Sequence, residues 1–270
     1  MTLTTLPPSE QSGRIGYRAA GTGAPLVLLH GVGMQSAAWA PQIATFSASH
    51  HVIALDLPGH GSSAHLPAGS NLTEFVDWAA GAIRALGHDR VSVAGHSMGA
   101  LVAGGLAVRH PDLVERAALL NGVFRRSEAA RDAVKARAAQ IGTGTFDIET
   151  PLARWFGAGS EDSSVRADVA DWLKAVDIDG YATAYSAFAG GDDVYANGFA
   201  TIRCPLLALT GDQDLNSTPA MSHAMADAAP MGQAVIIKGH GHMVNLTAPK
   251  EVNAALTSWL ETSPAKEDVA

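Results

Sequence analysis

Six short apolar runs recur along the chain, and segments with the spacing of amphipathic helices separate them. The runs cover residues 25–29, 52–55, 91–94, 117–120, 206–209 and 234–237. None of them alternates strictly between apolar and polar residues, which is typical of strands that helices cover on both faces. The sequence therefore predicts an α/β protein with a mostly parallel sheet. The loose alternation over 14–20 predicts an antiparallel strand or hairpin at the edge of that sheet.

The spacing of the runs breaks once, between Asn121 and Leu206. Helical patterns in this interval cover 128–140, 165–176 and 181–189. A stretch of more than eighty residues without a strand pattern exceeds an ordinary connection. Because ligands of open α/β sheets bind outside the carboxyl ends of the strands, an insertion at that edge covers the pocket. We therefore expect a helical cap over 123–200 and a core formed by 1–122 and 201–270.

The composition limits the kinds of partner. A formal charge of −8 over 270 residues, without a dense run of Lys and Arg, argues against nucleic-acid binding. No stretch approaches the ~20 apolar residues of a membrane span, and the first residues lack the pattern of a signal peptide. We therefore expect a cytoplasmic protein whose partner is a small molecule. The single Cys204 excludes an intramolecular disulfide and is expected to be buried at the start of a strand. The composition leaves monomer and homodimer open.

One of the predicted strands leads directly into a tight turn with a serine at its centre. Residues 93–99 read VAGHSMG, and a helical pattern follows them. Glycines on both sides let the backbone pass without Cβ clashes, so that the serine hydroxyl stands clear of the sheet. Ser97 is therefore the candidate nucleophile.

Two later loops carry the other side chains that an activated serine needs. The loop after the run 206–209 contains Asp212 and Asp214, and the loop after 234–237 contains His240 and His242. A histidine takes the serine proton, and a carboxylate holds the imidazole in the required tautomer. The chain order Ser, Asp, His is the order that α/β-hydrolases use. These residues predict nucleophilic catalysis, with either carboxylate and either imidazole as candidates.

Two further motifs extend the likeness to a known family. Residues 30–34 (HGVGM) resemble a His-Gly-x oxyanion loop, and residues 56–62 (DLPGHGS) resemble an Asp-x-x-Gly-x-Gly-x-Ser turn. Together with the serine turn, they make the chain resemble the α/β-hydrolase superfamily over nearly its whole length outside the cap. The resemblance implies an α/β-hydrolase fold, in which an eight-stranded, mostly parallel sheet has helices on both faces and an inserted helical cap.

The resemblance also implies which acid and which base act. In the family, the acid belongs to a Gly-x-x-Asp loop and the base to a Gly-His pair, which correspond here to Asp214 and His242. Asp212 and His240 are then the neighbours without a catalytic role. Some relatives take the acid from the end of the sixth strand, but that position falls near Asn121, which carries no negative charge.

Acyl transfer also requires two backbone N–H groups that stabilise the developing oxyanion. We expect them from Val32, in the His-Gly-x loop, and from Met98, which follows the nucleophile and begins a helix. His30, His60 and His96 are expected to have structural roles. The pair His240 and His242 lacks a third and fourth ligand at recognisable spacing, so we predict neither a metal site nor a cofactor.

The cap contains the candidate residues for substrate binding. Arg125 and Arg126 begin a locally basic stretch that can hold a carboxylate-bearing substrate, although a solvated helix face explains the same charges. Trp155 and Tyr185 are aromatic candidates for the pocket, for which core packing is the alternative. The Arg-Trp-Phe element around Trp155, with a later Asp-Gly-Tyr helix start, resembles the cap of 3-oxoadipate enol-lactonases and implies a small anionic substrate.

The function predicted from these features is hydrolysis of a small carboxylic ester or lactone, such as an anionic enol-lactone, through an acyl-enzyme. A C–C bond hydrolase acting on a vinylogous diketone uses the same triad and is the first alternative. A ligand-binding protein without catalysis on the same scaffold is the second. The serine at the nucleophile position argues against the relatives that use an aspartate nucleophile.

Overall fold

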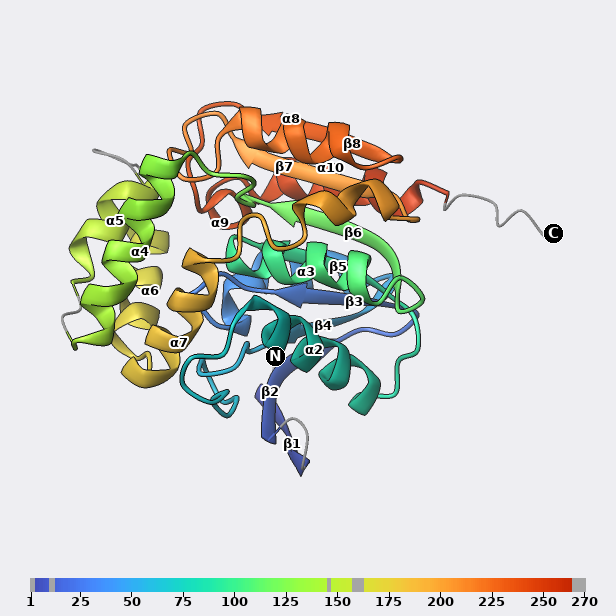
Figure 1. Ribbon diagram of the computed structural model, residues 1–270. Helices are drawn as coiled ribbons and strands as arrows, with labels where there is room; N and C mark the ends of the chain where they lie inside the picture. The colour runs from blue at the N-terminus through green and yellow to red at the C-terminus, as the bar shows by residue number, and fades with distance from the viewer. Residues whose placement is uncertain (1–2, 10–12, 145–146, 157–162, 264–270) are drawn as a thin grey trace.

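The computed structural model describes residues 3–9, 13–144, 147–156 and 163–263. Its eight strands form one sheet in the order β1-β2-β4-β3-β5-β6-β7-β8 (Figure 1). The strands are β1 (Leu3–Ser9), β2 (Gly13–Ala20), β3 (Ala24–Leu29), β4 (His50–Leu55), β5 (Val91–His96), β6 (Val114–Leu120), β7 (Leu206–Gly211) and β8 (Gly232–Ile237). The β1–β2 and β2–β4 pairs are antiparallel and all other neighbours are parallel. The predicted α/β class, the parallel sheet and the hairpin at its edge are confirmed.

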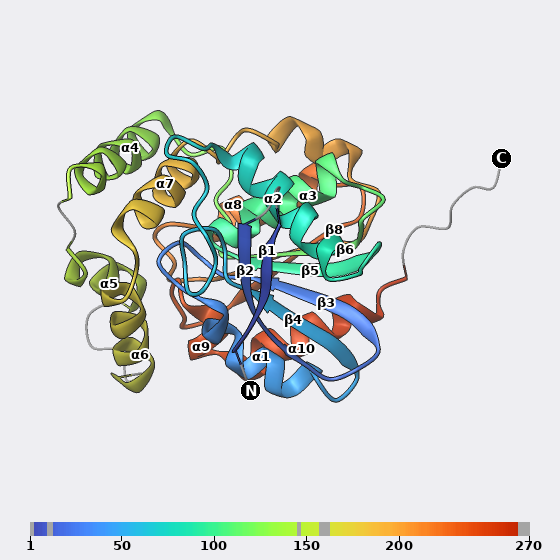
Figure 2. The ribbon, with the colours of Figure 1, turned by 90° about the horizontal axis from the view of Figure 1, so that it is seen from below.

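Helices cover both faces of the sheet (Figure 2). The helices on one face are α2 (Leu72–Ala85), α3 (Met98–Arg109) and α8 (Pro219–Ala228). Those on the other face are α1 (Ala40–Phe46), α9 (Val244–Thr247) and α10 (Pro249–Glu261). The central strands are mostly apolar because helices bury both of their faces, and each face has its own hydrophobic cluster. Cys204, just before β7, is buried as expected.

Four helices lie together beyond the carboxyl ends of the strands (Figures 1 and 2). They are α4 (Glu128–Gly142), α5 (Glu149–Phe156), α6 (Ser163–Lys174) and α7 (Ile178–Ala189). We call this group the cap helices. Two short 3-10 segments, Ser36–Trp39 and Ala196–Thr201, complete the described helical elements. The cap helices therefore occupy the edge of the sheet where ligands of α/β proteins bind.

Strand register brings the functional loops to this edge. His96 of β5 pairs with Leu120 of β6, which in turn pairs with Leu209 of β7. The next residues continue this alignment, because the Ser97 N–H donates to Leu120 O and the Asn121 N–H donates to Leu209 O. The loops after β5, β6 and β7 therefore leave the sheet side by side.

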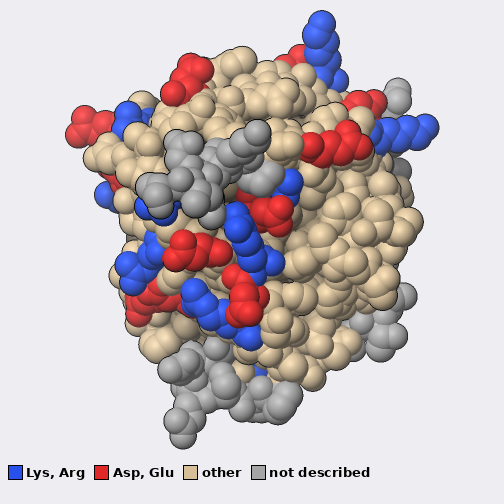
Figure 3. All heavy atoms as spheres, turned by 90° about the vertical axis from the view of Figure 1, so that its right-hand side faces the viewer, with Lys and Arg blue, Asp and Glu red and all other residues tan. Residues whose placement is uncertain are grey.

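The face opposite the cap helices has mixed charge. In Figure 3, Lys and Arg side chains lie next to Asp and Glu side chains, with uncharged surface around them. The described part of this face therefore has no continuous basic surface of the kind that binds phosphates. Within the described ranges, no helix combines the length and the hydropathy needed to span a membrane.

Candidate active site

Ser97 sits at the junction of β5 and α3 in a backbone conformation that few residues adopt. Its φ is 54° and its ψ is −113°, which places a non-glycine residue in a strained region. A Cβ on Gly95 would lie 1.9 Å from Gly99 O, and one on Gly99 would lie 2.1 Å from Leu29 O. Both glycines are therefore needed for the chain to reverse this sharply around Ser97.

The structure brings Ser97, His242 and Asp214 together in a buried hydrogen-bonded line. His242 Nε2 lies 3.1 Å from Ser97 Oγ, and His242 Nδ1 lies 2.8 Å from Asp214 Oδ2. The carboxylate accepts a hydrogen bond from Nδ1–H, which leaves Nε2 free to accept the serine proton. The three side chains thus have the geometry that activates a serine nucleophile.

Asp214 is held as a carboxylate by its surroundings. Burial by itself raises the pKa of this carboxyl, but the His242 imidazole and hydrogen bonds from His242, Asn121 and the Asn216 N–H lower it to about 2. Its Oδ1 accepts from the N–H groups of Asn216, at 2.7 Å, and Ser217, at 3.1 Å. The acid is therefore ionised at neutral pH.

Asp212 and His240 lie outside this line. Asp212 Oδ1 accepts the Gly239 N–H at 2.7 Å, and His240 Nδ1 lies 3.0 Å from Thr247 Oγ1. These contacts join the loop after β7 to the loop after β8 and to α9. Both residues therefore shape the loops that carry the acid and the base, without touching Ser97.

Val32 and Met98 lie beside the serine as the oxyanion proposal requires. Val32 lines the same cavity as Ser97, and Met98 opens α3 directly after it. A Cβ on Gly31 would lie 3.1 Å from Ser97 Cβ, so the loop 30–33 passes very close to the nucleophile. Among the backbone hydrogen bonds of the described residues, none uses the N–H of Val32 or of Met98. We propose that both N–H groups stabilise the oxyanion.

Three buried histidines hold the loops around the serine. His30 Nε2 accepts the Leu57 N–H and His60 Nε2 accepts the Gly33 N–H, each at 2.9 Å. His96 Nε2 lies 2.8 Å from His242 O and holds the base by its main chain. Each ring forms a hydrogen bond with a main-chain atom, which fits a structural role.

These histidines are expected to make the fold sensitive to acid. Burial, followed by the neighbouring His30, lowers the pKa of His60 from 6.5 to about 3, and burial followed by His242 lowers that of His96 to about 3. Below pH 6.5 these two imidazoles become protonated in the unfolded chain but stay neutral in the folded protein. The free energy of unfolding therefore falls as the pH decreases from 6.5 toward 3. At pH 4.5 the two residues together should cost about 5 kcal/mol. Urea unfolding at pH 7.5, 6 and 4.5 measures this loss, and a constant midpoint would contradict it. His60→Gln should make the decline shallower.

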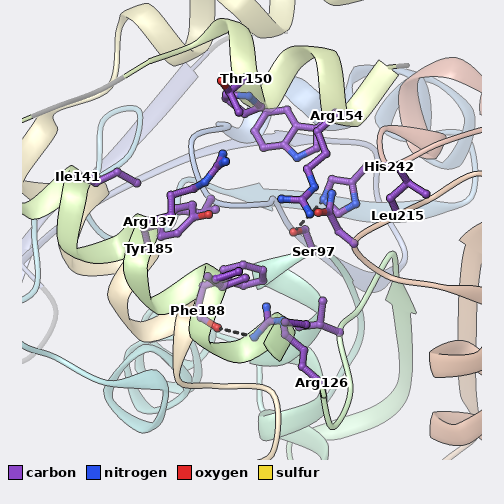
Figure 4. Close-up of a pocket in the computed structure, with 18 of the residues that line it drawn as sticks. Ser97, Arg126, Arg137, Ile141, Thr150, Arg154, Tyr185, Phe188, Leu215 and His242 are labelled. Carbon is purple, nitrogen blue, oxygen red and sulfur yellow. Dashed lines mark hydrogen bonds between the residues drawn. The ribbon is translucent and has the colours of Figure 1, made fainter. Parts of the chain in front are cut away.

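A cavity of about 470 Å³ opens above Ser97 and His242 (Figure 4). Its volume suits a small molecule. The cap helices supply most of its wall, including Arg137, Arg154, Trp155, Tyr185 and Phe188, and Arg126 adds to it from the segment just before α4. The core contributes Val32, Ser97, His242 and the segment after Asp214. A small molecule in this cavity would therefore have both Ser97 and arginine side chains within its walls.

The arginines of the cap differ in what they can bind. Arg137 reaches into the cavity from α4, and Arg154 extends from α5 toward Ser97 and His242 (Figure 4). Neither forms an ion pair within 4 Å among the described residues. Hydrogen bonds from Thr150 and the Glu149 N–H lower the pKa of Asp147, which also lines the cavity. The charge of Arg137 lowers this pKa further by a smaller amount. Both guanidinium groups are therefore available to an anionic ligand.

Arg126 lines the cavity but is already engaged. Its side chain is 3% exposed, its Nη1 lies 3.2 Å from Asp192 Oδ1, and its guanidinium lies 4.5 Å from the centre of the Phe188 ring. Asp192 also accepts from Arg131 at 3.1 Å. Arg126, just before the cap helices, is therefore joined to Asp192, just after them. Its guanidinium mainly contacts Asp192 and Phe188, which leaves it less available to a substrate than Arg137 or Arg154.

The structure corrects the expectation that Arg125 faces the pocket. Its φ is 46°, in the left-handed region. The Arg125 guanidinium is exposed, bonds Asn197 Oδ1 at 2.8 Å and does not line the cavity.

Trp155 and Tyr185 lie in the cavity wall as predicted. The Trp155 indole stacks on the His242 ring, with 5.9 Å between ring centres, and Trp155 O accepts the His242 N–H at 3.1 Å. Burial raises the pKa of the Tyr185 hydroxyl, whereas the charges of Arg137, Arg126 and Arg154 oppose this increase. Tyr185 is thus a protonated hydrogen-bond donor among three cations.

The sequence did not identify Arg137 and Arg154 as residues of the cavity wall, or Asn121 as a partner of the acid. Arg137 and Arg154 were visible only as members of basic or aromatic segments, because helical phase alone does not say which side of a cap helix faces the cavity. Asn121 was considered only as an uncharged alternative to the acid. In the structure its side chain donates to Asp214 itself.

Comparison with known proteins shows the family. A family model described as the alpha/beta hydrolase family matches residues 26–255. The chain is 53% identical, over 92% of its length and 94% of the relative, to the (E)-2-((N-methylformamido)methylene)succinate hydrolase of Acinetobacter baylyi. It is structurally similar to a thermophilic esterase from Thermogutta terrifontis solved with malate bound (TM-score 0.85, 25% identity, 96% of this chain and 98% of that one). It is also similar to the enol-lactonase of Burkholderia xenovorans (TM-score 0.81, 26% identity, 92% and 97%).

Proposed function

Because this chain belongs to the alpha/beta hydrolase family, we propose that it hydrolyses a small dicarboxylate whose scissile acyl bond is activated by conjugation through a C=C bond. The observation that carries the proposal is the Ser97–His242–Asp214 line opening into a cavity that contains Arg137 and Arg154. The line supplies the nucleophile and base, and the arginines supply the charge that a dicarboxylate requires.

The relative from Acinetobacter favours the vinylogous alternative over an ester or lactone. The substrate in its name is a succinate, with two carboxylates, joined through a methylene C=C to an acylated nitrogen. That compound contains no ester and no lactone. Its acyl bond is instead conjugated, as in the vinylogous substrates that formed the alternative. At 53% identity, the relative supports a substrate of this chemical class for this chain.

The proposed reaction proceeds by acyl transfer. His242 removes the Ser97 proton while Oγ bonds to the acyl carbon, and the N–H groups of Val32 and Met98 stabilise the oxyanion. The bond between the acyl carbon and its leaving atom, nitrogen or carbon, then breaks. Its electron pair delocalises through the C=C bond toward a carboxylate, and His242 returns the proton to the leaving group. Water activated by His242 finally releases the acid from Ser97.

The arginines are expected to provide selectivity for the dicarboxylate. Arg137→Gln and Arg154→Gln should each raise KM for a dicarboxylate substrate about tenfold or more, because each removes a charge-assisted hydrogen bond. Hydrolysis of neutral 4-nitrophenyl acetate should change little. Steady-state kinetics with both substrates measure the difference, and Arg125→Gln, outside the cavity, is the matched control. Equal losses with both substrates would contradict carboxylate binding by these residues.

Direct comparison of substrate classes tests the proposal. The protein is incubated with an N-acylaminomethylene succinate, a vinylogous diketone, an anionic enol-lactone and 4-nitrophenyl acetate. The loss of the conjugated chromophore is followed for the first three compounds, and the release of 4-nitrophenolate for the last. We expect the largest kcat/KM for the conjugated dicarboxylate and no turnover by Ser97→Ala. A higher kcat/KM for the enol-lactone would restore the lactone interpretation. Ligand binding without turnover of any compound would identify a binding protein.

A further inference from the structure

We infer that Asn121 is a positioning residue for Asp214, an inference that rests on the proposed hydrolase function. Asn121 follows β6 and is completely buried. Its Nδ2 lies 2.8 Å from Asp214 Oδ2, the same oxygen that accepts from His242 Nδ1 at 2.8 Å. This oxygen therefore receives two donors, one from the base and one from Asn121.

Asn121 also connects the other segments that meet at the acid. Its Nδ2 lies 3.1 Å from Thr210 Oγ1, at the end of β7, and 3.3 Å from Gly241 O, next to His242. Its main-chain oxygen accepts from Ser217 Oγ at 2.6 Å. The residue thus joins the end of β6, the acid loop and the base loop. A displacement of about 1 Å in such a site can lower the rate about a hundredfold.

The chemistry of this position favours asparagine over other residues. Its φ of 49° is a left-handed conformation that asparagine tolerates better than most side chains. The amide must present its N–H group to Asp214, because its oxygen would repel the carboxylate. In this orientation Oδ1 is buried with no hydrogen-bond partner among the described residues, an arrangement that disfavours folding. The hydrogen bond from Asn121 Nδ2 to Asp214 explains why the amide keeps this orientation although its Oδ1 has no partner among the described residues.

Two substitutions separate positioning from a general structural role. Asn121→Ala removes the donor. Asn121→Asp keeps the size and the tolerance of a positive φ, but places a second carboxyl against Asp214. At low pH the two carboxyl groups, at positions 121 and 214, share one proton. The protonated carboxyl at position 121 then donates a hydrogen bond to Asp214, as the Asn121 amide does in the wild type. The donor is lost when that proton leaves at higher pH. Besides Asp214, the titratable side chains at this junction are His242 and His96.

The rate at which a fluorophosphonate labels Ser97, followed by intact-protein mass from pH 5 to 9, is the readout that requires no knowledge of the substrate. We expect Asn121→Ala to label about tenfold to a hundredfold more slowly than wild type at every pH. Asn121→Asp should label at nearly the wild-type rate at pH 5, and its rate relative to wild type should fall as pH rises. A structural role alone would not produce this pH dependence.

Gln42→Ala is the matched control. Gln42 is a buried amide on α1 whose Nε2 donates to Asn245 O at 3.0 Å and whose Oε1 has no partner among the described residues. This variant should lose stability but label at the wild-type rate. Labelling of Asn121→Ala at the wild-type rate would overturn the inference, as would a constant Asn121→Asp to wild-type ratio across pH. A wild type that does not label would overturn the proposed function and the inference with it.

Discussion

Replacing Ser97 with alanine is expected to lower kcat/KM for the preferred substrate about ten-thousandfold or more, because no other side chain can form the acyl-enzyme. The strained turn that presents the hydroxyl remains, since Gly95 and Gly99 still provide the space for it. Substrate binding should therefore persist while turnover is lost. Initial rates and calorimetric binding of the unreacted dicarboxylate to Ser97→Ala measure the two effects separately.

Ser92→Ala is the control for this substitution. Ser92 is a buried serine on the same strand, β5, but it lies toward the end of the strand away from the cap helices. Its removal should leave kcat/KM within about twofold of wild type. A Ser97→Ala variant that retained more than a hundredth of the wild-type rate would show that the serine is not the nucleophile.

The fold was predictable because its signals are local and strong. Central strands covered on both faces are mostly apolar, and β5 and β7 are buried along their whole length. The turn at Ser97 was equally visible, because its backbone conformation requires Gly95 and Gly99 at fixed positions. Steric requirements of this kind appear directly in the sequence.

The contents of the cavity were less predictable, because they depend on how the cap helices are oriented. Arg125 and Arg126 are adjacent in sequence, yet one is exposed beside Asn197 and the other is buried against Asp192. Arg125 has a positive φ, and the sequence has no glycine at this position that would indicate such a backbone conformation. Arg154, on a different helix, extends toward Ser97 instead (Figure 4). Which arginine meets the substrate is thus a tertiary property.

The assignment of the acid rested on family resemblance, and the structure supplies a physical reason for it. Asp212 and Asp214 lie in one loop, but only Asp214 is surrounded by several donors. Two backbone N–H groups donate to its Oδ1, and the side chains of Asn121 and His242 donate to its Oδ2. Asp212 is exposed and caps the loop after β8 through Gly239. The same type of side chain therefore has two different roles, decided by burial and by the donors around it.

Asp214→Asn is accordingly expected to lower kcat about ten-thousandfold, whereas Asp212→Asn should leave it within about twofold. An amide at position 214 can present an N–H group to His242 Nδ1, which selects the tautomer that cannot accept the Ser97 proton. It also removes the negative charge that stabilises the imidazolium during proton transfer. Single-turnover kinetics of both variants test this difference. Comparable losses in the two variants would indicate that loop structure matters more than the charge of Asp214. A loss confined to Asp214→Asn, with KM unchanged, would establish that this charge acts on the transition state through His242.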